Sequence, residues 1–265
     1  MLLSKQMMRK FENYHFYKIC IDLYFSGFSR KKINGAALFW SNEIKDIWSN
    51  FALIDTKNAD SVVKAVVSFY KRIDRKPVVF ITPLSKPKNL DKTLIKNGFR
   101  KESEDSLMFY IGSKKIAIPD KLVIKRVINK KDLRVFIKVF QEAYGGKGKD
   151  EPYGKLGSGY GKAFMKRFNK KMGVSYFIAF VDNKPVGIGT LICSGKFGYV
   201  CNIGTLPSYR KQGIGAAITL NCVKNALRTK RKFIYLSTEA NTYNENFYNK
   251  IGFSTKIKWQ GYCLV

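Results

Sequence analysis

Residues 199–216 read YVCNIGTLPSYRKQGIGA. The apolar spacing up to Leu206 is typical of a β-strand, and Pro207 ends that pattern. From Ile214 onward, apolar residues recur every four positions, which predicts a helix. The stretch therefore predicts a strand, a basic loop with glycines, and a helix whose N-terminus faces the loop. Unpaired backbone N–H groups at such a terminus carry about half a positive charge, so they attract anions.

The loop suits a phosphate or a pyrophosphate group. Two glycines leave the backbone open to a bulky anion, and two basic side chains add positive charge beside it. The residues assigned to this site are Arg210, Lys211, Gln212, Gly213, Ile214, Gly215 and Ala216. A dinucleotide-binding fingerprint would need a third small residue at Ile218, and a P-loop would need Gly-Lys-Ser/Thr. An ordinary solvated turn is the alternative that the loop alone leaves open.

The segments that follow the loop strengthen its assignment to phosphate binding. A second strand is predicted at Phe233–Thr238, and Asn241, Tyr248 and Gly252-Phe253 come after it. In this order and spacing, roughly residues 120–265 resemble the acetyl-CoA-binding half of a GNAT-superfamily N-acetyltransferase.

The resemblance implies an α/β fold, layered as in α+β proteins, in which helices flank a twisted, mixed and mostly antiparallel sheet. It also implies two central strands that splay apart, one ending near Thr205 and the other at Phe233–Thr238. The pantetheine arm of acetyl-CoA would then pair with backbone groups of Ile203, Gly204 and Thr205, as an added strand does. The pyrophosphate would lie against the loop amides.

The resemblance also suggests catalytic roles. The N–H of Ile203 is the candidate oxyanion donor, and Tyr248 is the candidate donor of a proton to the departing thiolate. A phenol with a pKa of about 10 is protonated at neutral pH and able to donate. Packing in the helix is the alternative for Tyr248. Asn241 matches a family asparagine that contacts the coenzyme arm, and a helix N-cap is its alternative.

The general base is the least defined part of the predicted site. Tyr199 stands where members with a carboxylate on the central strand place it. Glu239, just after the second splayed strand, is the nearest candidate by sequence, although the sequence favours an exposed carboxylate at a strand end without a catalytic role. A water chain would serve instead, and Asp150 and Glu151 in a glycine-rich loop are placed to attract a cationic amine.

The length of 265 residues and the order of the predicted elements favour two domains, residues 1–118 and 119–265. A shift of 154 residues places Val79-Phe80-Ile81 on Phe233-Ile234-Tyr235, and Gly98-Phe99 on Gly252-Phe253. We infer two GNAT-like copies in tandem. The first copy lacks the polar residues of the second, because Thr56, Ala59, Ser61 and Leu94 replace Arg210, Gly213, Gly215 and Tyr248.

The second half is predicted to begin with a strand at Leu122–Val127 and an amphipathic helix at Lys131–Tyr144. Seven glycines within residues 145–161 then predict a linker or a mobile binding loop, because such a segment is costly to fix in one conformation. A further helix is predicted at Lys162–Lys171.

The net charge of +30 arises from 49 Lys and Arg against 19 Asp and Glu. Such an excess attracts polyanions, but the lysines are spread along the chain, which favours solvated surfaces over a nucleic-acid site. A single histidine, His15, and scattered cysteines argue against a metal site. Since no apolar run reaches the ~20 residues of a membrane span, and the start does not resemble a secretion signal, we expect a cytoplasmic protein.

These features predict an acetyl-CoA-dependent N-acetyltransferase that transfers an acetyl group directly to a primary amine, without a metal. The acceptor, a small molecule or a peptide, is not identified by the sequence. A non-catalytic module that binds acyl-CoA and acts through a partner is the alternative. A nucleic-acid-associated protein is the third possibility that the charge leaves open.

Overall fold

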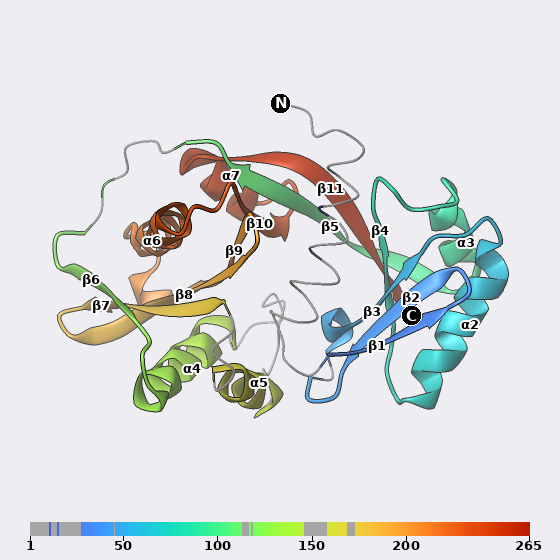
Figure 1. Ribbon diagram of the computed structural model, residues 1–265, viewed down its shortest axis with the longest axis horizontal. Coiled ribbons are helices and arrows are strands. Elements are labelled where there is room, and N and C mark those ends of the chain that lie inside the picture. The colour runs from blue at the N-terminus through green and yellow to red at the C-terminus, as the bar shows by residue number, and fades with distance from the viewer. Residues whose placement is uncertain are drawn as a thin grey trace. The chain divides into compact units, whose positions relative to one another are not determined.

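The computed structural model describes residues 11, 15, 28–44, 46–112, 117, 119–145, 158–168 and 173–265. Asp150 and Glu151 lie outside these ranges. The chain forms two compact units, each described separately below (Figure 1). The first contains Met1–Leu107, Thr238–Glu245 and Thr255–Val265, and the second contains Met108–Ser237 and Asn246–Ser254.

The sequence predicted two consecutive domains, residues 1–118 and 119–265, whereas the compact units are not consecutive in sequence. The first unit also takes two segments from late in the chain, Thr238–Glu245 and Thr255–Val265. The physical reason is strand pairing, because β11 (Phe253–Leu264) pairs with β4 (Val78–Ile81) in antiparallel register, from Gln260 opposite Ile81 to Cys263 opposite Val78. Such long-range pairing leaves no mark in a local pattern.

The first unit is a mixed sheet with two helices. Its strands follow the order β1-β2-β3-β4-β11-β5, of which only β3 and β4 are recorded as a parallel pair. The elements not yet bounded are β1 (Phe28–Ile33), β2 (Ala36–Ser41), the 3-10 turn η2 (Ile47–Ser49), β3 (Asn50–Ile54), α2 (Ala59–Arg72), α3 (Leu90–Lys96) and β5 (Phe99–Tyr110). Apolar residues at helical spacing on α2, such as Val63 and Val66, are fully buried against this sheet.

The second unit is a larger α/β layer that contains the loop of residues 210–215. Strands β6 to β9 form an antiparallel meander, and β10 pairs with β9 in parallel. The strands are β6 (Leu122–Arg126), β7 (Val174–Val181), β8 (Lys184–Ser194), β9 (Phe197–Thr205) and β10 (Phe233–Glu239). The helices are α4 (Lys130–Tyr144), α5 (Ser158–Phe168), α6 (Ile214–Arg228) and α7 (Tyr243–Lys250), with a 3-10 turn η3 (Pro207–Tyr209).

Helices cover both faces of this sheet. A Cβ atom added to Gly189 of β8 would lie 2.4 Å from Ile218 of α6, whereas one added to Gly204 of β9 would lie 3.0 Å from Tyr144 of α4. In Figure 1, α6 lies on one side of β7 to β9, and α4 and α5 lie on the other. The predicted α/β layered fold, with a mostly antiparallel mixed sheet flanked by helices, is therefore confirmed.

Helix α5 begins four residues earlier than predicted. Ser158–Gly161 is helical and belongs to the segment that the sequence assigned to a glycine-rich loop. A glycine in a helix costs roughly 1 kcal/mol relative to alanine. Here Tyr160 and Phe164 are buried against Phe140 of α4, with ring centroids 5.6 and 4.9 Å away. Burial of these rings offsets the cost of the glycines. Within the described residues, no helix has both the length and the apolarity needed to cross a membrane.

Candidate active site

The central strands of the second unit separate after a short paired stretch. Strands β9 and β10 are in parallel register only at residues 197–199 and 233–235. Beyond Tyr199, β9 continues to Thr205 along β8, and no pairing with β10 is recorded in this fully described region. Beyond Tyr199, that edge of the described strand β9 is therefore not paired with β10, as the resemblance implied.

A β-bulge lies in the separated part of β9. Ile188 of β8 is opposite Gly204 and Thr190 is opposite Cys201, so Gly189 alone faces both Asn202 and Ile203. Asn202 has a φ of 52°, and its side-chain amide nitrogen donates to the Thr190 hydroxyl at 3.3 Å. A bulge bends its strand and increases its twist, and bulges are frequent next to active sites. It accounts for the divergence of β9 from β10.

Two side chains hold the carbonyl groups on this part of β9. The Tyr144 hydroxyl donates to the Ile203 carbonyl at 2.8 Å. Arg210 donates through Nε to the Thr205 carbonyl at 3.2 Å and through Nη2 to the Ala143 carbonyl at 3.0 Å. The end of α4, the end of β9 and the loop are therefore tied together. The guanidinium of Arg210, which the sequence assigned to the pyrophosphate, is used for this connection.

Tyr144 was not identified from the sequence, where it is only the last residue of an amphipathic helix. The residue that could have indicated a role for Tyr144 is Gly204, a glycine of β9 on which Tyr144 packs. A Cβ atom on Gly204 would lie 3.0 Å from Cε2 of Tyr144 and 3.1 Å from Cβ of Ala143. Gly204 therefore allows the end of α4 to approach β9 closely enough for the hydrogen bond.

The loop leads into a helix N-terminus without a side-chain cap. Gly213 is the N-cap residue of α6, in the left-handed conformation with φ 79°, and no described side chain caps the helix there. The first helical bond runs from the Ala217 N–H to the Gly213 carbonyl at 3.0 Å. The amides of Ile214, Gly215 and Ala216 precede it, so they have no partner within the helix. This arrangement is suited to an anion.

The two loop glycines differ in the space around them. A Cβ atom on Gly215 would have its nearest neighbours at 3.6 Å (Oγ1 of Thr205) and 3.7 Å (Cζ of Phe247), which are ordinary contacts. One on Gly213 would lie 2.9 Å from the carbonyl oxygen of Ala117. The predicted phosphate site is thus open at Gly215 and crowded at Gly213. The side chains of Lys211 and Gln212 are exposed at its rim.

Tyr248 lies on α7, whose Phe247 ring faces Gly215 at the N-terminus of α6. Its ring centroid is 5.0 Å from that of Phe247 and 6.1 Å from that of Phe253, and it packs half-buried against the core of the second unit. The position is compatible with both interpretations of Tyr248, proton donor and packing residue. Its catalytic role stays a prediction.

Glu239 and Asn241 belong to the first unit, whereas the residues above belong to the second. Asn241 has a φ of 60°, and its backbone N–H donates to the Glu245 carboxylate at 2.6 Å. The N-cap of α7 is Thr242, whose hydroxyl accepts from the Glu245 N–H at 3.5 Å. The N-cap alternative for Asn241 is therefore wrong, because Asn241 precedes the cap. Its coenzyme contact stays a prediction.

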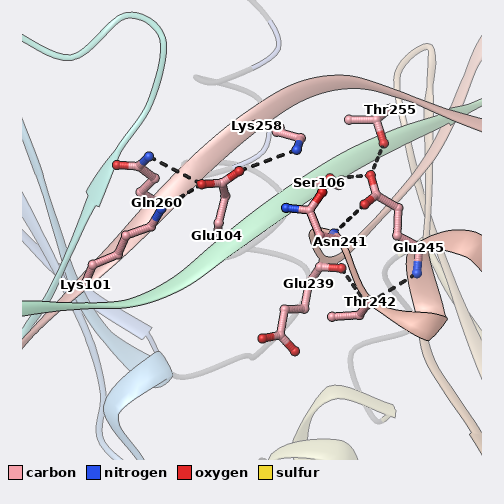
Figure 2. A network of polar contacts seen from close by, with 10 residues as sticks. All are labelled: Lys101, Glu104, Ser106, Glu239, Asn241, Thr242, Glu245, Thr255, Lys258 and Gln260. Carbon is pink, nitrogen blue, oxygen red and sulfur yellow. Dashed lines mark hydrogen bonds and ion pairs between the residues drawn. The ribbon is translucent and has the colours of Figure 1, made fainter.

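Figure 2 shows the polar network around these residues. The carboxylate of Glu245 accepts from the hydroxyls of Ser106 at 2.7 Å and Thr255 at 2.6 Å, and these hydrogen bonds lower its pKa. The side chain of Glu239 is exposed, and its carboxylate points away from Glu104 and Glu245 in Figure 2. The network fixes the start of α7 and leaves the Glu239 carboxylate outside it.

Asp105 is a second carboxyl group in this region that sequence reasoning missed. Burial raises the pKa of Asp105 to about 6, and the charge of Glu239 also raises this pKa. A hydrogen bond from the Ser103 hydroxyl, at 3.2 Å, lowers it and opposes these two effects. A carboxyl group with a pKa near neutrality suits proton transfer. No local sequence pattern reveals this group, because the shift of its pKa depends on tertiary burial.

Metal-binding clusters and the single histidine are the other groups that could contribute chemistry. In the described ranges, no group of three or more His, Cys, Asp or Glu side chains is arranged to hold a metal ion. His15 is buried beside Trp259 of the first unit, with ring centroids 5.0 Å apart, and burial lowers its pKa to about 3. It is therefore neutral at physiological pH.

Comparison with known proteins identifies the class. Residues 172–255, which include the bulge, the loop, α6 and Tyr248, match the family model described as "Acetyltransferase (GNAT) domain". The matched region is therefore an acetyltransferase domain of the GNAT type, and the protein is an acyltransferase. More particularly, the second unit contains nearly all of the matched GNAT domain. No curated protein sequence matches the chain.

Solved structures agree on the fold. A GCN5-related N-acetyltransferase from Kribbella flavida is similar over 89% of this chain and 89% of its own, with a TM-score of 0.67 and 14% identity. One from Sphaerobacter thermophilus covers 86% and 80%, with a TM-score of 0.62 and 13% identity. A tandem GNAT protein from the clavulanic acid biosynthesis pathway covers 86% and 77%, with a TM-score of 0.59 and 10% identity.

Proposed function

We propose that the protein is an acetyl-CoA-dependent N-acetyltransferase that transfers the acetyl group directly to a primary amine. One observation carries the proposal: an uncapped helix N-terminus, open at Gly215, lies next to the separated end of β9 within the matched GNAT domain. The helix N-terminus offers backbone amides to a pyrophosphate. The edge of β9 offers its backbone groups to the pantetheine arm, which contains amides. A cytoplasmic location, expected from the sequence, is part of the proposal.

Different residues of the second unit would bind different parts of the coenzyme. The amides from Gln212 to Ala216 would hold the pyrophosphate, with Lys211 as an added charge. The Ile203 and Thr205 carbonyls already accept from Tyr144 and Arg210. A carbonyl oxygen has two lone pairs. An N–H of the pantetheine arm would therefore either share the carbonyl with the existing donor or replace that donor.

Direct transfer forms a bond between the amine nitrogen and the acyl carbon and breaks the bond from that carbon to sulfur. The amine proton passes to a base, and the departing thiolate takes a proton from the Tyr248 hydroxyl. The Ile203 N–H would stabilise the oxyanion that forms in between. Glu239 stays the sequence-based candidate for the base, and its substitution by glutamine tests that role. The proposed reaction uses no metal.

The first unit supports the inference of a degenerate tandem copy. The N-terminus of α2 corresponds to that of α6, and it borders a depression of ≈ 450 Å³ lined in part by Asn58, Asp60 and Ser61. The Asp60 carboxylate, 2.8 Å from the Lys64 ammonium, puts negative charge in the first turn of α2. Negative charge there repels a phosphate. We propose that acyl transfer belongs to the second copy alone.

A non-catalytic acyl-CoA-binding module is the second candidate. Tyr199, which replaces the carboxylate expected on the central strand, packs its ring 4.9 Å from that of Tyr235. An aromatic pair at this position accepts no proton from an amine.

The test combines binding and turnover on the full chain. Calorimetry with acetyl-CoA measures binding, and mass spectrometry follows acetylation of a panel of amino acids, polyamines, aminoglycosides and peptides. Binding with an acetylated product supports the enzyme, and binding without a product from any amine supports the module. Absence of coenzyme binding refutes both.

A further inference from the structure

A shallow groove runs between α4 and α5 on the second unit. Figure 1 shows the two helices side by side, and contacts between them are recorded. The groove has a volume of ≈ 420 Å³. The lining residues are Arg134, Ile137, Lys138 and Gln141 from α4, and Gly161, Lys162 and Met165 from α5.

The groove lies on the outer side of the helix pair. Leu133, Phe136 and Phe140 bury the inner face of α4, whereas Arg134 and Lys138 are exposed. The floor is apolar, because Ile137 and Met165 are half-buried and Gly161 has no side chain to fill the space. A Cβ atom on Gly161 would lie 3.6 Å from Cγ2 of Ile137, so the floor is formed by close contact between the helices.

The rim carries positive charge that pairs with no carboxylate of the described residues. This charge belongs to Arg134, Lys138 and Lys162, which line the groove. Lys131 and Lys166, one helical turn away, extend the basic edges. Glu142 is the one exposed acidic residue on α4, and it does not line the groove.

We propose that this groove docks an acidic polypeptide segment that carries one apolar anchor side chain. The cationic rim complements acidic side chains, and the apolar floor gives the anchor a surface to bury. None of the described residues that line the groove is an aromatic residue on which a base would stack, which disfavours a nucleic acid. The docking site is separate from the residues proposed to bind the coenzyme and does not depend on acyl transfer.

The test measures fluorescence anisotropy of a labelled peptide, Glu-Glu-Leu-Glu-Glu-Phe-Glu-Glu, and of an all-glutamate peptide of equal length, with the full chain. The rim variant combines Arg134→Glu, Lys138→Glu and Lys162→Glu. It should bind the anchored peptide at least about tenfold more weakly, a loss of roughly 1.4 kcal/mol. The floor variant Ile137→Ala should weaken the anchored peptide about threefold and leave the all-glutamate peptide unchanged, because it removes only apolar contact.

A matched charge control separates the groove from the general positive field. The control variant changes three exposed residues of the same unit by the same total charge, through Lys184→Glu, Lys196→Glu and Lys224→Glu. Binding of the anchored peptide to this variant should stay within about twofold, since distant charges are screened in physiological salt. Equal losses in the two triple variants overturn the proposal.

Two further outcomes also overturn it. If uridine-rich RNA of matched charge binds more tightly than the peptide and the rim variant abolishes this, the groove is a nucleic-acid site. If only anionic vesicles bind, it is a lipid-facing surface. Circular dichroism and the affinity for coenzyme A should be unchanged in the rim variant, so failure here is distinguishable from failure of the proposed acyl transfer.

Discussion

Replacement of Gly215 by alanine tests where the pyrophosphate binds. The added methyl group would have its nearest protein neighbours at 3.6 and 3.7 Å, which the fold accommodates without movement. Alanine is also favoured over glycine in a helix by up to about 1 kcal/mol. We therefore expect Gly215→Ala to keep or slightly raise the melting temperature. Any loss of coenzyme binding then reports on the ligand and not on the fold.

The expected loss follows from the amides at the start of α6. A methyl group on Gly215 occupies the space through which an anion approaches those amides, and we expect at least one charge-assisted hydrogen bond to break. Such a bond contributes roughly 1.5–3 kcal/mol, which corresponds to about ten- to hundredfold weaker binding of coenzyme A. Isothermal titration calorimetry with coenzyme A, together with a thermal melt, measures both quantities.

The control is Lys224→Ala, an exposed position on the same helix where no effect on coenzyme affinity is expected. The reasoning is refuted if Gly215→Ala keeps its stability and binds coenzyme A as tightly as the unmodified protein. The pyrophosphate would then lie away from the N-terminus of α6, and with it the central support for the proposed function would be lost.

Four further substitutions test other parts of the site. Tyr248→Phe should lower turnover by about 10²- to 10⁴-fold and leave coenzyme affinity unchanged, and equal turnover would remove the hydroxyl from the mechanism. Tyr144→Phe keeps the ring but removes the bond to the Ile203 carbonyl, so urea denaturation should show a loss of about 1 kcal/mol. For Asp105, a folded-state pKa of about 6 lies above the ordinary 3.8, so its contribution to stability is present at low pH and is lost as pH rises through 6. Asp105→Asn should therefore abolish this part of the pH dependence of unfolding, and an unchanged profile would contradict the assigned burial. Glu239→Gln should lower turnover and leave coenzyme affinity unchanged if Glu239 is the base, whereas unchanged turnover excludes it.

The local parts of the site were readable from the sequence. Strand β9 ends at Thr205, just before the predicted break at Pro207, and α6 begins at the predicted Ile214. Both follow from apolar periodicity and from Pro207 and the loop glycines, which act within a few residues. The family resemblance rests on the same local features and gave the correct fold class.

The missed features depend on contacts between distant segments. Tyr144 donates a hydrogen bond to Ile203, 59 positions away in the sequence, and Ser106 donates one to Glu245, 139 positions away. The buried state of Asp105 and the start of α5 likewise depend on tertiary packing that no local pattern records. The second strand and the helix after it were predicted, but the division of each of them between the two compact units was not.

The interleaving of the two units constrains the order in which the protein is assembled on the ribosome. The first unit needs β11, made last, to pair with β4, made some 180 residues earlier. Until then one edge of β4 has no partner, so the unit that is translated first is the last to be finished. A deletion that ends the chain near residue 118 would leave that edge exposed, and the first half is therefore not a separable module.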